Sequence, residues 1–143
     1  ANPVPINPNN FKNPKKGMAL TALAGPVSNI LMSFISLFFY YGIVYTVGLG
    51  NTVLYAIAYF FYFSASVNVT LAVFNLIPIP PLDGSRILFA ILPSKFYFGI
   101  MKYERYIMAA MFLLLLTGVL TTPLSYLSKL IYNAFNQLFY SIF

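Results

Sequence analysis

Apolar residues fill this chain in long runs, separated by short stretches rich in proline, asparagine, glycine or charge. The first long run covers residues 17–47 and the second covers residues 52–74. Each run exceeds the roughly 20 residues that an α-helix needs to cross a bilayer. Both are therefore predicted to be transmembrane helices, joined by an uncharged turn at residues 48–51.

The second half of the chain has shorter apolar runs, at residues 85–92, 106–120 and 124–143. We expect a short helix from the first run, a third membrane span from the second, and a last helix that is transmembrane or interfacial from the third. Residues 1–16 hold four prolines and five asparagines, which favour a loop or hairpin. The predicted fold is an all-α polytopic membrane protein with about four transmembrane segments.

A proline-rich segment interrupts the apolar pattern after the second long run. Residues 75–84 read NLIPIPPLDG, in which Pro78, Pro80 and Pro81 lack backbone donors. Each proline also disfavours helical geometry in the residue before it. The second span is therefore expected to end near Asn75, and residues 75–84 are predicted to form a broken-helix loop inside the membrane.

Composition supports a membrane location. The 143 residues are 60% hydrophobic and 7% charged, whereas soluble domains are about 25% charged. The net charge of +6 comes from scattered cations, and no polar face gathers them into a surface for nucleic acid. We therefore expect the lipid bilayer, and no nucleic acid, as a partner. Cysteine and histidine are both absent from the sequence, which excludes disulfides and thiolate metal sites within it.

The positions of the cations predict an orientation. Six of them flank the predicted spans: Lys12, Lys15, Lys16, Lys95, Lys102 and Arg105. The turns expected on the opposite side are uncharged. Because cytoplasmic loops carry an excess of Lys and Arg, residues 1–16 and 94–105 are predicted to be cytoplasmic.

Asp83 is the only aspartate, and it lies between two membrane segments. An ionisable group at membrane depth costs several kcal/mol unless it is paired, hydrated or bound to a metal, so Asp83 is a candidate functional residue. A simpler role is to cap the helix that begins at Gly84, and the two roles are compatible. Glu104 stands beside Lys102 and Arg105, where ion pairing is the expected role.

Small and amide side chains form a stripe along each of the two long runs. The stripes comprise Gly25, Ser28, Asn29, Ser33 and Ser36 in the first run, and Ser64, Asn68, Ala72 and Asn75 in the second. Such residues let membrane helices approach closely and form hydrogen bonds, so packing explains most of them. Asn75, at the break, and Asn29, near the start of the first span, are also candidates to face the same cavity as Asp83.

These residues match a known family. The segment from Asn75 to Gly84 closely resembles the asparagine, proline, proline, aspartate, glycine signature of site-2 proteases, which are zinc intramembrane metalloproteases. Ala24-Gly25-Pro26-Val-Ser-Asn29 resembles the helix opening that precedes this signature in compact bacterial members. The stretch PVPINPNNFKNPKKGMALTALAGP and the later Tyr103-Glu104-Arg105-Tyr106 also resemble those members, so the similarity covers nearly the whole chain.

The resemblance implies a zinc site with Asp83 as one ligand and two histidines of a His-Glu-x-x-His helix as the others. This chain has no histidine, so we expect that helix upstream of Ala1 and no catalytic residue within the 143 residues. The implied substrate is a transmembrane helix of another membrane protein, cut during regulated intramembrane proteolysis in a bacterial cell membrane. Asn75, Pro78, Pro80 and Asn29 are implied to shape the cavity or hold the unwound substrate.

Two other functions remain open from the sequence. A non-catalytic relative would bind transmembrane segments without cutting them, and it would lack histidine in its natural form. A small transporter subunit is the other alternative, because ion-coupled carriers also build sites from discontinuous helices with a lone carboxylate. Against the transporter, the chain shows no inverted repeat of the broken-helix segment.

Overall fold

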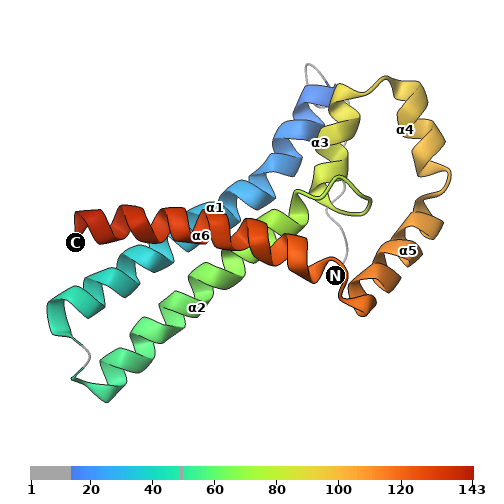
Figure 1. Ribbon diagram of the computed structural model, residues 1–143. Helices are drawn as coiled ribbons and strands as arrows, with labels where there is room; N and C mark the ends of the chain where they lie inside the picture. The colour runs from blue at the N-terminus through green and yellow to red at the C-terminus, as the bar shows by residue number, and fades with distance from the viewer. Residues whose placement is uncertain (1–13, 49) are drawn as a thin grey trace.

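The computed structural model describes residues 14–48 and 50–143, and in these residues it contains helices and no strand (Figure 1). The helices are α1 (Pro14–Val47), α2 (Thr52–Asn75), α3 (Asp83–Ile91), α4 (Ser94–Met101), α5 (Glu104–Thr117) and α6 (Thr121–Ile142). The all-α prediction is therefore confirmed. The loop predicted at the start of the chain lies mostly outside the described residues.

Helices α1 and α2 form a long antiparallel hairpin, and both are long and apolar enough to cross a membrane. Gly48 follows α1 with a φ of 69°, a left-handed conformation that glycine adopts without strain. The side chain of Asn51 then accepts hydrogen bonds from the N–H groups of Val53 and Leu54, at 3.0 and 3.2 Å. This N-cap satisfies two donors that the first turn of α2 leaves without partners.

Small residues line the contact between α1 and α2. The Ser33 hydroxyl donates to the carbonyl of Ala65 at 2.9 Å, and the Ser36 hydroxyl donates to the hydroxyl oxygen of Ser64 at 3.3 Å. Ser33, Ser36 and Ala65 are all buried. Short side chains allow the two backbones to approach, and each hydroxyl finds a partner away from water. The packing role predicted for Ser33 and Ser36 is confirmed.

The break predicted at the prolines is present, and it separates two helices, α2 and α3, that both pack against α1. Helix α2 ends at Asn75, residues 76–82 form an irregular loop, and α3 then runs beside the first part of α1 (Figure 1). A Cβ at Gly84 would collide with the carbonyl oxygens of Leu76 and Ile77. Glycine at the start of α3 therefore allows the loop to fold directly onto that helix.

Helix α6 lies across the hairpin and packs against α1 and α2 (Figure 1). Phe139 of α6 is buried with Leu37 and Ala65 in the hydrophobic core. The Tyr41 hydroxyl also donates to Oδ1 of Asn136 at 2.8 Å. Aromatic packing and this hydrogen bond fix α6 onto the face of the hairpin.

Two helices begin earlier than predicted, because prolines taken as breaks lie in first turns. Helix α1 begins at Pro14 rather than at residue 17, and α6 begins at Thr121 rather than at residue 124, with Pro123 inside its first turn. The N–H groups of a first turn have no intrahelical partner, so a proline there removes no hydrogen bond.

The second half of the chain differs more from the prediction. The expected polar connection contains α4, and α5 has only 14 residues, about 21 Å at 1.5 Å per residue and too short to cross a bilayer alone. Gly118, with a φ of 75°, ends α5, and α6 then departs at a bend of 80°. Within the described residues there are two candidate spans, or three if α5 and α6 form one broken span, so a count of four is not confirmed.

Glu104 also differs from its predicted role. It is the first residue of α5, and it forms no ion pair with any residue that the structure describes. Its carboxylate instead lies at the positive end of the α5 dipole, a favourable position for an anion.

Candidate functional site

Asp83 is the first residue of α3 and is half-buried. Leu82 occupies the N-cap position, and no side chain makes a capping hydrogen bond to this helix. The simple capping role considered for Asp83 is therefore wrong. The carboxylate still lies at the positive end of the α3 dipole, a favourable position for an anion.

Asp83 faces Gly25 in the first half of α1. A Cβ at Gly25 would lie 2.9 Å from Oδ2 of Asp83, so the carboxylate occupies the space that a larger side chain would fill. Gly25 lies about 16 Å along the axis from the start of α1. Along the axis of α1, the half-buried carboxylate therefore lies nearer the end that carries Lys15 and Lys16 than the turn at Gly48.

The carboxylate of Asp83 has no hydrogen-bond or ion-pair partner in the part of the chain that the structure describes. Polar groups in the neighbouring α1–α2 contact do have partners, such as Ser33 with Ala65. Leaving an ionised group inside a membrane without a partner is unfavourable by several kcal/mol. The arrangement thus leaves the Asp83 carboxylate available to a ligand, as far as the described residues are concerned.

Pro26 adds an irregularity to α1 beside this carboxylate. It is buried within the helix and cannot donate to the carbonyl of Ala22, its usual partner one turn earlier. Gly25, with no side chain, leaves room on this turn of α1 for the Asp83 carboxylate at the start of α3.

The other predicted site residues differ in their positions and in how far they are buried. Asn29 is half-buried on α1, four residues and about one turn after Gly25. Asn75 is the half-buried last residue of α2, Pro80 is buried and Pro78 is exposed. The contact that the structure does show is between Asp83 and Gly25. A role for Asn29, Asn75, Pro78 and Pro80 in a cavity stays a prediction.

The sequence analysis placed Gly25 in a packing stripe and missed its contact with Asp83. The available signal was the pair Gly25-Pro26, since a glycine beside a proline within an apolar helix often marks close approach of another segment. Asn68 was predicted to pack between helices, but its Nδ2 donates to the carbonyl of Ser64 at 2.8 Å, within its own helix. A packing role for Asn68 across helices stays a prediction.

Asp83 fits the role of one zinc ligand. Zinc accepts carboxylate oxygens together with histidine nitrogens and cysteine sulfurs, and this carboxylate is unpartnered among the described residues and lies against Gly25, which has no side chain to cover it. No group of three or more His, Cys, Asp or Glu side chains exists in residues 14–48 and 50–143. These residues can therefore supply one ligand to a zinc ion but not a complete coordination sphere.

Comparison with known proteins identifies a family. The sequence model of peptidase family M50 matches residues 41–118, which include the break and Asp83. A Bacillus subtilis protein named "Putative zinc metalloprotease YwhC" is 37% identical over 95 residues, which are 65% of this chain and 43% of that protein. The Methanocaldococcus jannaschii protein "Putative zinc metalloprotease MJ0611" is 39% identical over 67 residues, 47% of this chain and 31% of that protein.

The chain thus spans less than half the length of these two relatives. No solved structure matches it. The geometry around Asp83 therefore has to be interpreted from this chain itself.

Proposed function

The chain belongs to peptidase family M50, the site-2 protease family, and from this premise we propose that the whole protein is a zinc-dependent intramembrane endopeptidase. These 143 residues contribute one metal ligand, Asp83, and the broken-helix wall of the active site. The observation that carries the proposal is the half-buried carboxylate of Asp83, which faces Gly25 at the break in a transmembrane hairpin and has no partner among the described residues.

Zinc in such a site supplies a Lewis acid and an acidified water for attack on a peptide carbonyl. Asp83 would bind and orient the metal from the first turn of α3. The remaining ligands and the general base would come from parts of the protein outside these residues, since the 143 residues contain no histidine.

The loop at residues 76–82 has a second part in the proposal. A transmembrane substrate must unwind before it is cut, and each unwound amide needs a hydrogen-bond partner inside the membrane. The loop has irregular backbone, Asn75 carries a side-chain amide where the loop begins, and Asn29 carries another on α1, about one turn after Gly25. We assign these groups to holding the unwound substrate, a transmembrane segment of another membrane protein.

The test uses the full-length protein purified from its native membranes. Asp83→Ala should lower both the zinc content per molecule and the cleavage rate of a reconstituted transmembrane reporter. We expect losses of more than about a hundredfold, because removing even an outer partner of a metal ligand costs about 10-fold to 100-fold. Asn68→Ala is the matched control, since it removes a polar side chain that bonds only within α2.

An Asp83→Ala protein that keeps its zinc and its cleavage rate would rule out Asp83 as a ligand. A second function, binding of transmembrane segments without cleavage, is favoured by one observation, the absence of histidine from these residues. A wild-type full-length protein that contains no zinc and binds the reporter without cutting it would establish this second function instead.

A further inference from the structure

A cavity of about 350 Å³ lies between the first turns of α1, the helix α3 and the helix α4, away from Asp83. Its volume falls in the range of small-molecule sites, roughly 300–1,000 Å³. Its walls are unlike those of the carboxylate site, because they combine two cations with aromatic and aliphatic side chains and include no acidic residue. This combination points to an amphipathic anion.

The two cations come from different helices and reach the same cavity. Lys15 is at the start of α1, and its Nζ donates to the carbonyl of Leu92 at the end of α3, at 2.9 Å. An ammonium has three donors, so this contact fixes the Lys15 side chain and uses one of them. Arg86 is on the first half of α3. Its guanidinium makes no hydrogen bond or ion pair with the residues that the structure describes.

A guanidinium on a membrane-embedded helix is unfavourable without an anion or water nearby. Asp83 is three residues earlier on α3, yet the two side chains form no ion pair among the described residues. Arginine side chains usually extend toward the membrane surface while their methylene stems stay in apolar surroundings. Lys15 and Arg86 both line this cavity, so an anion bound in it would have both cations in its walls.

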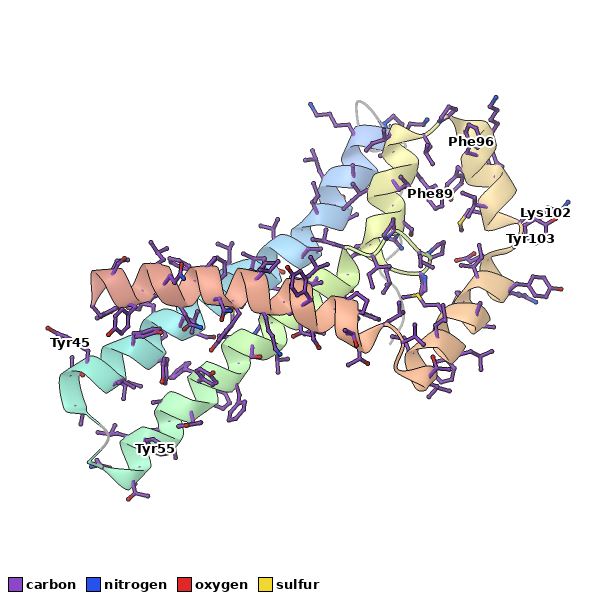
Figure 2. All side chains as sticks on the ribbon, viewed as in Figure 1. Tyr45, Tyr55, Phe89, Phe96, Lys102 and Tyr103 are labelled. Carbon is purple, nitrogen blue, oxygen red and sulfur yellow. The ribbon has the colours of Figure 1, made fainter. Side chains whose placement is uncertain are left out.

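The rest of the cavity is apolar and aromatic. Phe89 lies on the side of α3 toward α4 (Figure 2). Its ring meets that of Tyr97 of α4 edge to face, with ring centroids 5.1 Å apart at 85°. Met18 and Ala90 add aliphatic walls from α1 and α3. Helix α4 otherwise packs little against the bundle, and its only substantial helix contact among the described residues is with α3. A molecule in this cavity would therefore contact α1, α3 and α4 together.

We propose that the cavity binds an anionic phospholipid. The lipid phosphate would lie between the Lys15 ammonium and the Arg86 guanidinium. The part of the acyl chain nearest the headgroup would pack along Phe89, Tyr97 and Met18. Basic pockets between membrane helices near the surface are suited to such headgroups, and Arg pairs with phosphate through two parallel hydrogen bonds. Lys16 and Lys95 lie at the same end of the molecule and add to the positive potential.

The position of the lipid gives it a structural consequence. Arg86 is one turn after Asp83 on a helix of only 9 residues, so a lipid bound to Arg86 restrains the helix that carries the carboxylate. The lipid would also join α4 to the bundle. The inference concerns lipid binding, and it holds whether or not the protein is a protease.

Native mass spectrometry of the full-length protein, released from nanodiscs of equal parts phosphatidylglycerol and phosphatidylcholine, tests the proposal. Phosphatidylglycerol should stay bound preferentially. Arg86→Gln and Lys15→Gln should each lower its retention about fivefold, and the double variant about 25-fold. Lys102→Gln is the matched control, since it removes one cation outside the cavity, where Lys102 lies over the ring of Tyr103, and it should leave retention unchanged.

A second variant tests the apolar wall without changing charge. Ala90→Phe places a ring in the cavity, and it should lower phosphatidylglycerol retention while the helix content measured by circular dichroism stays the same. Equal retention in wild type and the double variant would overturn the proposal. So would complete displacement of the lipid by inorganic phosphate at millimolar concentration, because a site for a free anion would not need an acyl chain.

Discussion

Helix α1 packs against two helices, and the two contacts differ in whether their polar side chains have hydrogen-bond partners. Along its later part it packs against α2, where the Ser33 hydroxyl bonds to Ala65 and the Ser36 hydroxyl bonds to Ser64. Along its first part it packs against α3, where Asp83 faces Gly25 and has no partner within the described chain. Both contacts use small residues on α1 to bring a second helix close.

Whether a polar group has a hydrogen-bond partner distinguishes a packing contact of α1 from a candidate functional contact. A polar group whose hydrogen bond is already made contributes to association of the helices, by about 0.6 kcal/mol on average in membranes. A charged group left without a partner weakens the fold, and it persists where a ligand compensates for it. Small residues alone therefore do not distinguish the two contacts, whereas the bonding state of the opposite polar group does.

The largest expected effect tests the fold of the break. In Gly84→Ala the new Cβ meets the backbone carbonyls of Leu76 and Ile77, which cannot rotate away. We expect a loss of about 3 kcal/mol in the free energy of unfolding, at the upper end of overpacking costs. Thermal or denaturant unfolding in detergent measures it. Gly99→Ala, in α4 with nothing within 4 Å of the new Cβ, is the control. Equal stability of the two variants would contradict the close packing of the loop on α3.

A smaller effect is expected at the carboxylate itself. In Gly25→Ala the new Cβ meets Oδ2 of Asp83 at 2.9 Å, and the end of a side chain can move where a backbone cannot. The fold should remain, while the displaced carboxylate lowers zinc retention by the full-length protein about tenfold, as loss of an orienting contact does. Dialysis against a chelator, followed by metal analysis, measures this retention.

Gly42→Ala provides the comparison for that variant. It lies on the same helix, its new Cβ meets nothing within 4 Å, and it gains the same helix propensity of about 1 kcal/mol. Zinc retention should equal that of wild type. If Gly25→Ala and Gly42→Ala retain zinc equally, Gly25 does not position Asp83.

The smallest effect is expected in the contact with α2. Ser33→Ala removes the hydrogen bond to the Ala65 carbonyl, which should lower stability by about 0.6 kcal/mol and leave zinc retention unchanged. Ser141→Ala removes a hydroxyl that bonds only to Leu138 of its own helix, on an exposed face, and it should change neither quantity. A loss of zinc in Ser33→Ala would show that the two contacts of α1 are not separate.

Much of the fold was predictable because its causes are local. Runs of apolar residues predicted α1 and α2, and the prolines predicted where α2 ends. The start of α1 and the second half of the chain were less predictable. A proline in a first turn looks the same in the sequence as one that ends a helix, and a 14-residue apolar helix such as α5 resembles a short membrane span until its bend is known.

The candidate site was predictable as a residue but not as an arrangement. Asp83 was identifiable because a lone carboxylate in a long apolar sequence has an unfavourable free energy in a membrane, whichever way the helices pack. Its contact with Gly25 and the cavity between Lys15 and Arg86 join residues about 60 to 70 positions apart, and no local pattern encodes such pairs. An apolar helix in lipid also carries no amphipathic period to show which face packs inward.

The sequence by itself thus determined the membrane class, a break within residues 75–84, the candidate ligand Asp83 and the resemblance to the family, since each follows from composition or from neighbouring residues. Only the tertiary structure decided that α3 returns beside the first half of α1, that Asp83 remains without a partner among the described residues, and that Lys15 and Arg86 share one cavity. These outcomes depend on close packing between distant segments, where a single Cβ decides whether two backbones can meet.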